Sequence, residues 1–223
     1  MNSTVQNIYF INLDSCTERR NKMISDFDGA LPDNFKLIRW NATRHRDGWK
    51  GCILSHTKVL SYLSEQEQSG LYIVLEDDCR LLDTKEVFKE RFEKYYKYLK
   101  EHMGEWDVFL AGGIYLKPKR IVCRDPFIIE SDWGVCSQFN IHTNKSAATI
   151  VDFGFNPEKW KKSIDTYLSS QHRGKIWLPY PFLCDQNLEY KSTIGSTDGY
   201  TQRIKKGFED AKILLDEFVK NNS

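Results

Sequence analysis

The chain has 223 residues, in which 32 Lys and Arg nearly balance 31 Asp and Glu. No basic run exceeds a few residues, so the charge pattern argues against an electrostatic grip on nucleic acid or on an anionic membrane. This length is enough for one sizeable α/β core and short for two full domains. We therefore expect a single α/β domain whose partners need not be polyanions.

The cysteine and hydropathy patterns further restrict the class of protein that the sequence can encode. The six cysteines form no CxxC pair and no short-spaced Cys/His cluster of the kind that a structural zinc needs, so we expect free thiols. No window approaches the apolar length of a transmembrane helix, and no apolar signal segment follows the start. The expectation is a soluble, cytoplasmic protein.

Strand and helix patterns alternate in the first half of the chain. Residues 7–13 form a short apolar run rich in β-formers, Asp14-Ser15 break it, and a polar helix pattern follows. Strand, polar turn and helix in this order are typical of the opening of a nucleotide-binding α/β unit. The expected strands are 7–13, 36–40 and 71–75, and the expected helices run from Thr17 to before Gly29 and from Trp49 to about Gln68.

The second half mixes helix patterns with shorter strand patterns, so the sheet should be mixed. Asp83 and Glu86 have capping-box spacing, and Asn144 and Pro157 are residue types that begin helices. The expected elements are a helix from Asp83 through Leu99, a strand at 106–111, antiparallel structure over 119–141, a helix from Asn144 stopped by Gly154, a helix from Asn156-Pro157, and loop with a short strand over 177–185.

The last expected helix, over about 201–220, has one apolar stripe. The stripe consists of Ile204, Phe208, Ala211, Leu215 and Phe218, at three- and four-residue steps. We expect it to dock on the core of its own chain. A homodimer seam is the alternative, because a single stripe does not distinguish the two.

The strongest chemical signal is the acidic triplet Glu76-Asp77-Asp78 after an apolar strand. Open α/β sheets place their ligand crevice at this carboxyl end. Residues two apart on a strand point the same way, so Glu76 and Asp78 can hold a hard divalent cation while Asp77 faces back toward the fold. The alternative is a solvated acidic turn that caps the next helix.

A second element follows the first strand. Asn12-Leu13-Asp14 stands at its carboxyl end, with Arg19 and Arg20 on the following helix. Asp14 can receive a base or ribose group, and either arginine can meet phosphate, because a guanidinium binds oxyanions bidentately. The alternative is a helix-starting aspartate with a solvated basic face.

A third element is Gly51-Cys52-Ile53-Leu54-Ser55-His56. Cys52 and His56 are one helical turn apart and share a face. On its own, His56 would be interpreted as a core histidine with satisfied hydrogen bonds.

Taken in order, the three elements resemble glycosyltransferase family 25, which contains bacterial lipopolysaccharide-type and procollagen-type galactosyltransferases. The resemblance rests on Ile11-Asn12-Leu13-Asp14 with Arg19 and Arg20, on Gly51-Cys52 with Ser55-His56, and on Val74-Leu75-Glu76-Asp77-Asp78. Weaker similarity over 134–148 and 181–188 extends it to about residues 7–190.

The resemblance implies a fold and a division of the chain into two functional halves. The fold would be a single GT-A-type, Rossmann-like α/β domain with a mixed, mostly parallel central sheet flanked by helices. A nucleotide-sugar half would cover about residues 1–115 and an acceptor half about 116–200, followed by the C-terminal helix.

The resemblance also implies an activity and its residues. The protein would be a Mn²⁺- or Mg²⁺-dependent inverting transferase that moves a hexose, with galactose or glucose favoured, from a UDP-sugar to a hydroxyl on a glycan or protein. Glu76 and Asp78 would hold the metal, and Asp185 would be the catalytic base or else a metal or donor contact. The nucleotide-sugar would contact Asn12, Leu13, Asp14, Arg19, Arg20, Ser55, His56, Glu76 and Asp77.

Two other functions remain open on the sequence. One is an inactive glycan- or nucleotide-binding module, because Trp49-Lys50 stands where the family usually has an acidic residue. The other is a metal-dependent phosphohydrolase, although that class usually adds histidines to the metal shell and none of the five here is near the triplet in sequence.

Overall fold

The computed structural model describes residues 5–66, 70–190 and 199–222. In the first half, strands and helices alternate as the sequence predicts, and the expected helix end at Gln68 lies outside the described residues. The elements are β1 (Gln6–Asn12), α1 (Thr17–Phe27), β2 (Phe35–Asn41), α2 (Gly48–Gln66) and β3 (Leu71–Glu76).

The second half is more finely divided than the sequence predicts. The antiparallel structure expected over 119–141 is resolved into three strands, and the region 177–185 into two. The elements are β4 (Cys79–Leu81), α3 (Lys85–Glu101), β5 (Val108–Leu110), β6 (Pro118–Arg124), β7 (Phe127–Ser131), β8 (Phe139–Thr143), α4 (Asn144–Phe155), the 3-10 helix η1 (Pro157–Lys159), α5 (Ile164–Gln171), β9 (Ile176–Pro179), β10 (Cys184–Gln186) and α6 (Tyr200–Asn221).

Two helix caps differ from the prediction by one residue. The cap of α3 is Thr84, whose Oγ1 accepts from Val87 N at 3.4 Å, because Asp83 pairs with Arg91 instead. Threonine also caps α4, since the expected cap, Asn144, lies inside the helix and its side chain accepts from Tyr72. In both cases another side chain engages the residue expected as the cap, from α3 itself for Asp83 and from β3 for Asn144.

Helix α4 also runs past its expected stop. Gly154 lies inside it, where an added Cβ would fall 1.6 Å from Thr57 Oγ1. This glycine therefore allows close packing of α4 on α2, and does not end the helix. The helix expected from Asn156-Pro157 is only the short 3-10 helix η1.

One eight-stranded sheet runs through the chain in the order β2-β1-β3-β8-β5-β9-β7-β6. β1 pairs in parallel with β2 and β3, and β5 with β9, while β8 and β7 run against their neighbours. The predicted mixed, mostly parallel sheet is confirmed. β8 lies between β3 and β5, so segments from both halves of the chain interleave in the sheet.

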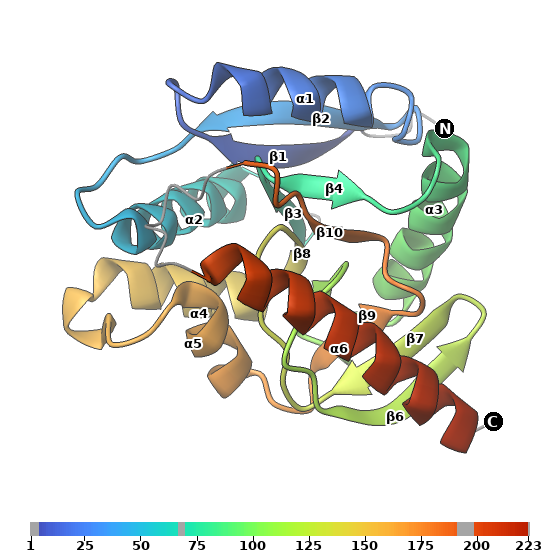
Figure 1. Cartoon of the computed structure of the whole chain (residues 1–223). Coiled ribbons are helices and arrows are strands. Elements are labelled where there is room, and N and C mark those ends of the chain that lie inside the picture. The colour runs from blue at the N-terminus through green and yellow to red at the C-terminus, as the bar shows by residue number, and fades with distance from the viewer. Residues whose placement is uncertain (1–4, 67–69, 191–198, 223) are drawn as a thin grey trace.

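Helices cover both faces of this sheet (Figure 1). Alternate residues of β1 point to opposite faces: Ile8 and Phe10 pack with α1 and α3, whereas Tyr9 and Ile11 pack with α2, α4, α5 and α6. The two hydrophobic clusters make a three-layer α/β/α core. This arrangement confirms the predicted fold class.

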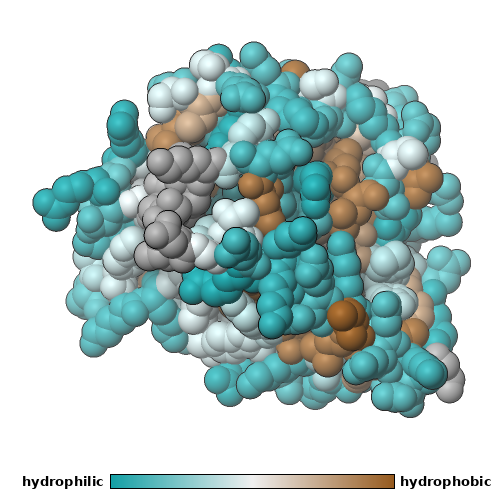
Figure 2. Space-filling view, in the orientation of Figure 1, coloured by the Kyte–Doolittle hydropathy of each residue, from teal (hydrophilic) through white to brown (hydrophobic). Residues whose placement is uncertain are grey.

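The C-terminal helix docks on its own chain. Ile204, Phe208, Ala211 and Leu215 are buried, which confirms the docking interpretation and leaves a dimer seam through this stripe without support. On the outer side of α6, Ile213 and Leu214 are 57% and 37% exposed, and Figure 2 shows a largely hydrophilic surface on this side of the molecule. Among the described residues, none of the helices combines the length and apolar character needed to span a membrane.

Candidate functional site

The parallel strands β1, β2 and β3 end at one edge of the sheet, and the segments after them enclose a cavity. Ile11 pairs with Glu76 and Asn12 with Asn41, so the three strand ends lie side by side. This first cavity has a volume of about 380 Å³. It is lined by Ile11, Leu13, Ser15, Cys16, Arg19, Ala42, Thr43, Arg44, His45, Arg46, Gly48, Gly51, Cys52, Ser55, His56, Glu76, Asp77, Asp78 and Gln186.

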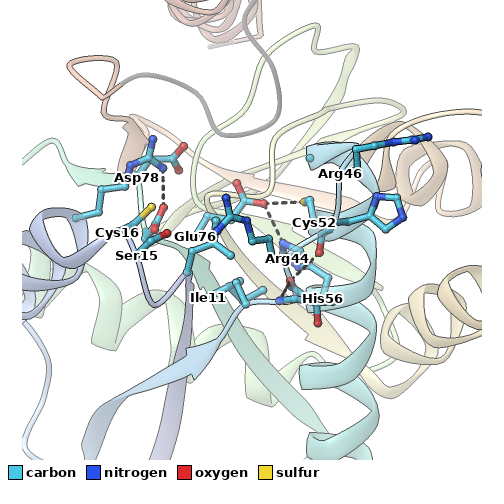
Figure 3. A pocket seen from close by; sticks show the side chains of 18 of the residues that line it. Ile11, Ser15, Cys16, Arg44, Arg46, Cys52, His56, Glu76 and Asp78 are labelled. Carbon is cyan, nitrogen blue, oxygen red and sulfur yellow. Dashed lines mark hydrogen bonds and ion pairs between the residues drawn. The ribbon is translucent and has the colours of Figure 1, made fainter.

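Glu76 stands at the floor of the first cavity and is held through one of its oxygens. His56 Nε2 donates to Glu76 Oε1 at 2.9 Å, Ser137 Oγ at 2.8 Å and Cys52 Sγ at 3.4 Å (Figure 3). Burial alone would raise the pKa of Glu76, but the bond and charge of His56 and the bond from Ser137 leave it lowered. The side chain is thus kept ionised and fixed in orientation.

Asp78 has one satisfied and one unsatisfied oxygen. Gln186 Nε2 donates to Oδ2 at 2.7 Å, whereas the buried Oδ1 has no hydrogen-bond partner among the residues that the structure describes. Burial, and then the charge of Glu76, raise the pKa of Asp78 to about 7. A buried carboxylate oxygen without a donor is costly unless a positive group meets it. Asp78 therefore marks the place in this cavity where a cation would be stabilised.

Asp77 turns to a different set of partners. Asn12 Nδ2 donates to Asp77 Oδ2 at 2.7 Å and Arg19 Nη1 to Oδ1 at 2.9 Å. Burial raises the pKa of Asp77, against the lowering effect of Arg19. Asn12 also accepts from Arg39 Nε at 2.9 Å, so it lies behind the cavity as a positioning residue. Arg19 lines the cavity as well as holding Asp77.

The remaining site residues predicted in and after the loop that follows β1 do not all reach the first cavity. Leu13 lines the first cavity, but Asp14 and Arg20 do not. Asp14 is 70% exposed and pairs with Arg39 at 2.5 Å, a contact that lowers its pKa. The structure therefore does not bring Asp14 or Arg20 to the cavity.

The Gly51 to His56 segment builds one wall through its own backbone. Ser55 Oγ donates to Gly51 O at 2.7 Å and accepts from Thr43 N at 2.8 Å. A Cβ on Gly51 would lie 2.7 Å from Thr43 O, so only glycine lets the segment after β2 lie this close to α2. Ser55 and Gly51 together fix that segment over the cavity.

This segment contributes three basic residues that the sequence analysis did not single out. Arg44, His45 and Arg46 all line the first cavity, and the Arg46 side chain is 93% exposed and points outward (Figure 3). Figure 3 shows Arg44 on the same side as His56, with Ser15 and Cys16 on the side of Asp78. The available signal was a run of basic residues directly after a predicted parallel strand. Cations facing a carboxylate floor are suited to a ligand that carries both a metal ion and phosphate.

Asp185 lies elsewhere. It is on β10, where Arg80 donates to both of its oxygens, at 2.7 and 2.9 Å. Successive residues of a strand face opposite sides, so Gln186 lines the cavity and Asp185 points to Arg80. The structure does not bring Asp185 to the cavity.

A second cavity of about 520 Å³ adjoins the first. The two share Cys52, Glu76 and Gln186. The remaining lining residues are Trp49, Ile114, Tyr115, Trp133, Val135, Cys136, Ser137, Gln138, Ser163, Ile164, Asp165, Thr166, Tyr200, Arg203 and Ile204. Glu76 therefore lies where the two cavities meet, and the lining of the second includes four aromatic residues, Trp49, Tyr115, Trp133 and Tyr200.

Two groups of side chains fit a metal ion in different ways. Within the described residues, Cys52, His56 and Glu76 have ligand atoms within 4.8 Å of one another, but these atoms already hydrogen-bond and burial raises the pKa of the Cys52 thiol. Glu76 and Asp78 offer carboxylate oxygens, including the unpartnered Asp78 Oδ1. Oxygen ligands suit Mg²⁺ or Mn²⁺, so the carboxylate pair fits the predicted cation.

No protein-family model and no curated protein matches this chain. Among solved structures, a UDP-glucose pyrophosphorylase complexed with UDP-glucose is 11% identical, with a TM-score of 0.46 over 93% of this chain and 100% of that chain. A197 from STIV is 14% identical, with a TM-score of 0.43 over 78% and 81%. The glycosyltransferase GlyE of Streptococcus pneumoniae TIGR4 is 12% identical, with a TM-score of 0.39 over 78% and 44%.

Proposed function

We propose that this protein is a metal-dependent glycosyltransferase whose first cavity binds a UDP-sugar and Mn²⁺ or Mg²⁺. The observation that carries the proposal is the buried, unpartnered Oδ1 of Asp78 beside Glu76, at the carboxyl edge of a parallel sheet. The reaction proposed is transfer of a hexose, with galactose or glucose favoured, to a hydroxyl with inversion at the anomeric carbon. The resemblance to family 25 agrees with this function.

The carboxylates and the arginines of the first cavity would bind different parts of the donor. Glu76 and Asp78 would hold the cation, and a bound cation would neutralise the charge that develops on the departing diphosphate. Arg44 lines the same cavity and would contact phosphate oxygens. His56 and Ser137 keep Glu76 in one orientation through their bonds to Oε1, which leaves its other oxygen for the cation.

The test is release of nucleotide from a panel of UDP-sugars, with and without Mn²⁺. The wild type is compared with Asp78→Asn, which keeps the shape of the side chain and removes its charge. The matched control is Asp33→Asn, since Asp33 is an exposed partner of Lys89 far from the cavity in sequence. We expect metal-dependent release from one or two donors, lost in Asp78→Asn and retained in Asp33→Asn.

The identity of the released nucleotide separates the alternatives. A glycosyltransferase acting on water releases UDP and free sugar, whereas a phosphohydrolase that cuts between the phosphates releases UMP. UMP as the product would assign the site to phosphohydrolysis. Binding of a UDP-sugar with no release, in the presence of every acceptor tried, would assign it to an inactive binding module.

A further inference from the structure

The second cavity opens directly onto the floor of the first. Cys52, Glu76 and Gln186 line both, so a group in one cavity can reach a group in the other across Glu76. Its volume, about 520 Å³, lies in the range of small-ligand pockets, which is about 300–1,000 Å³. A molecule held there would face the sugar end of a donor whose phosphates lie among the arginines of the first cavity.

The walls of the second cavity present aromatic faces. Trp49 and Trp133 line it, and each has a cation over its ring: Lys50 Nζ lies 5.4 Å from the Trp49 centroid and Arg173 Cζ 5.6 Å from the Trp133 centroid. Neither cation lines the cavity, so each indole is held from outside and offers the rest of its surface inward. Fixed aromatic surfaces with a few polar groups are typical of sites for small organic ligands, including carbohydrates.

Besides Glu76, one carboxylate among the described residues lines the second cavity. Asp165, in the first turn of α5, lines the cavity and accepts from Thr166 N at 2.7 Å. Burial raises the pKa of Asp165, and the charge of Glu76 adds to the shift. A partly buried carboxylate that is oriented by a backbone bond is suited to accept a proton.

The backbone of the same wall is strained at two places. Tyr115 has φ of 54° and Cys136 φ of 134°, values that side-chain-bearing residues rarely adopt, and both residues line the cavity. The adjacent Ile114 and Val135 exchange two backbone hydrogen bonds, of 3.0 and 3.1 Å, which hold the strained segments together. Strain of this kind costs on the order of 1–3 kcal/mol per residue and clusters at ligand sites.

We propose that the second cavity binds the acceptor, that the acceptor is a carbohydrate, and that Asp165 is the base that takes its hydroxyl proton. This inference rests on the proposed function. The acceptor oxygen forms a bond to the anomeric carbon of the donor sugar as the bond from that carbon to the diphosphate oxygen breaks. The bonding electron pair leaves with the nucleoside diphosphate, and the hydroxyl proton goes to Asp165 and then to water.

Binding of the acceptor is tested without any chemistry. The probes are methyl α- and β-glycosides of glucose, galactose, mannose and N-acetylglucosamine, titrated in the presence of UDP and Mn²⁺ and followed by saturation-transfer NMR. We expect saturable binding of at least one glycoside. Trp133→Ala should weaken this binding about tenfold or more, and the milder substitution Trp133→Phe should weaken it less. Phe155→Ala is the control, because Phe155 is exposed on α4 and lines neither cavity. No saturable binding of any glycoside overturns the carbohydrate assignment.

The role of Asp165 is tested by comparing transfer with donor hydrolysis. Asp165→Asn should lower transfer to the bound glycoside by about 10²- to 10⁴-fold, a larger drop than in the slow release of UDP without glycoside. Asp152→Asn, at an exposed ion pair with Lys159, should lower neither. Transfer that survives in Asp165→Asn and is lost in Asp185→Asn would move the base to Asp185 and overturn the proposal. Glycoside binding without UDP release by the wild type would instead reject the proposed function and leave the binding site standing.

Discussion

The two cavities that meet at Glu76 are built from different parts of the chain and have different chemistry. The first is formed at the ends of β1, β2 and β3 and sets arginines against carboxylates. The second is formed by α2, α5, α6 and the strained segments around Tyr115 and Cys136, and its lining mixes four aromatic residues with aliphatic and polar ones. The charged cavity is suited to a metal and phosphates and the aromatic one to a neutral ligand, and Glu76 couples the two.

The largest effect is expected at the shared residue. Glu76→Gln removes a ligand charge and also breaks the bonding pattern with His56 and Ser137. Both UDP release and transfer should fall by about 10³-fold, because metal and donor placement depend on the same side chain. Steady-state kinetics with Mn²⁺ titration measures this, with Glu65→Gln on the exposed face of α2 as the matched control. Loss of transfer alone would show that Glu76 serves only the second cavity.

Smaller effects, on the KM of one substrate at a time, should show that the two cavities bind different ligands. Arg44→Ala removes a cation from the first cavity, so KM for the UDP-sugar should rise by about 10- to 100-fold with KM for the acceptor unchanged. Trp49→Ala should show the opposite pattern, since Trp49 lines only the second cavity. Lys58→Ala, at an exposed position on α2, is the reference for a lost surface charge. If both variants raise the same KM, the two cavities form a single site for one ligand.

The free energy of unfolding should fall when a side chain is added at the close backbone contact in the wall of the first cavity. Gly51→Ala places a Cβ 2.7 Å from Thr43 O, which should lower the free energy of unfolding by on the order of 2 kcal/mol and displace the arginine segment. Gly29→Ala is the comparison, because Gly29 has φ of 75° and open space around its Cβ position. Both should unfold earlier in urea, but only Gly51→Ala should also weaken UDP binding by calorimetry. Equal UDP affinity in the two variants would show that Gly51 does not help to shape the first cavity.

The smallest effect lies away from the cavities, at His142 on β8. His142 pairs with Tyr72, at the opposite end of β3 from Glu76, and burial lowers its pKa to about 3. The unfolded chain takes up this proton near pH 6.5 and the folded chain does not, so stability falls as the pH drops through this window. From pH 7 to 5.5 the loss should be roughly 1 kcal/mol. In His142→Leu this loss should disappear from urea titrations while UDP release at pH 7 is retained; an unchanged pH dependence would place the acid-sensitive group elsewhere.

The parts of the site predicted from sequence are those fixed by neighbours along the chain. Glu76 ends the buried strand β3, and Asp77 and Asp78 follow it in the turn before β4, so the apolar run next to them was enough to place the triplet at a strand end. His56 follows Cys52 by one helical turn, so both reach Glu76 from one face of α2. Strand and helix patterns of the first half were predicted for the same reason, since hydrophobic periodicity is local.

Other parts depend on contacts between distant segments, which local patterns do not encode. The cap of α4 shifted from Asn144 because Tyr72, 72 residues away, engages its side chain. The orientation of Asp185 follows from its pairing with Arg80, a partner 105 residues away. No sequence pattern distinguishes Asp165 from other helix-starting aspartates until α5 is packed beside Glu76.

The sequence by itself determined an α/β chain, a carboxylate pair at the end of β3 and an apolar stripe on α6, because each follows from the spacing of neighbouring residues. Only the tertiary structure decided that Arg44 lines a cavity together with this pair, that Asp185 pairs with Arg80 outside it, and that a second cavity with Trp49 and Trp133 in its lining adjoins it. The physical reason is that a cavity is a space left between elements. Its shape and its lining are set by strand order and helix packing, and these depend on the whole chain at once.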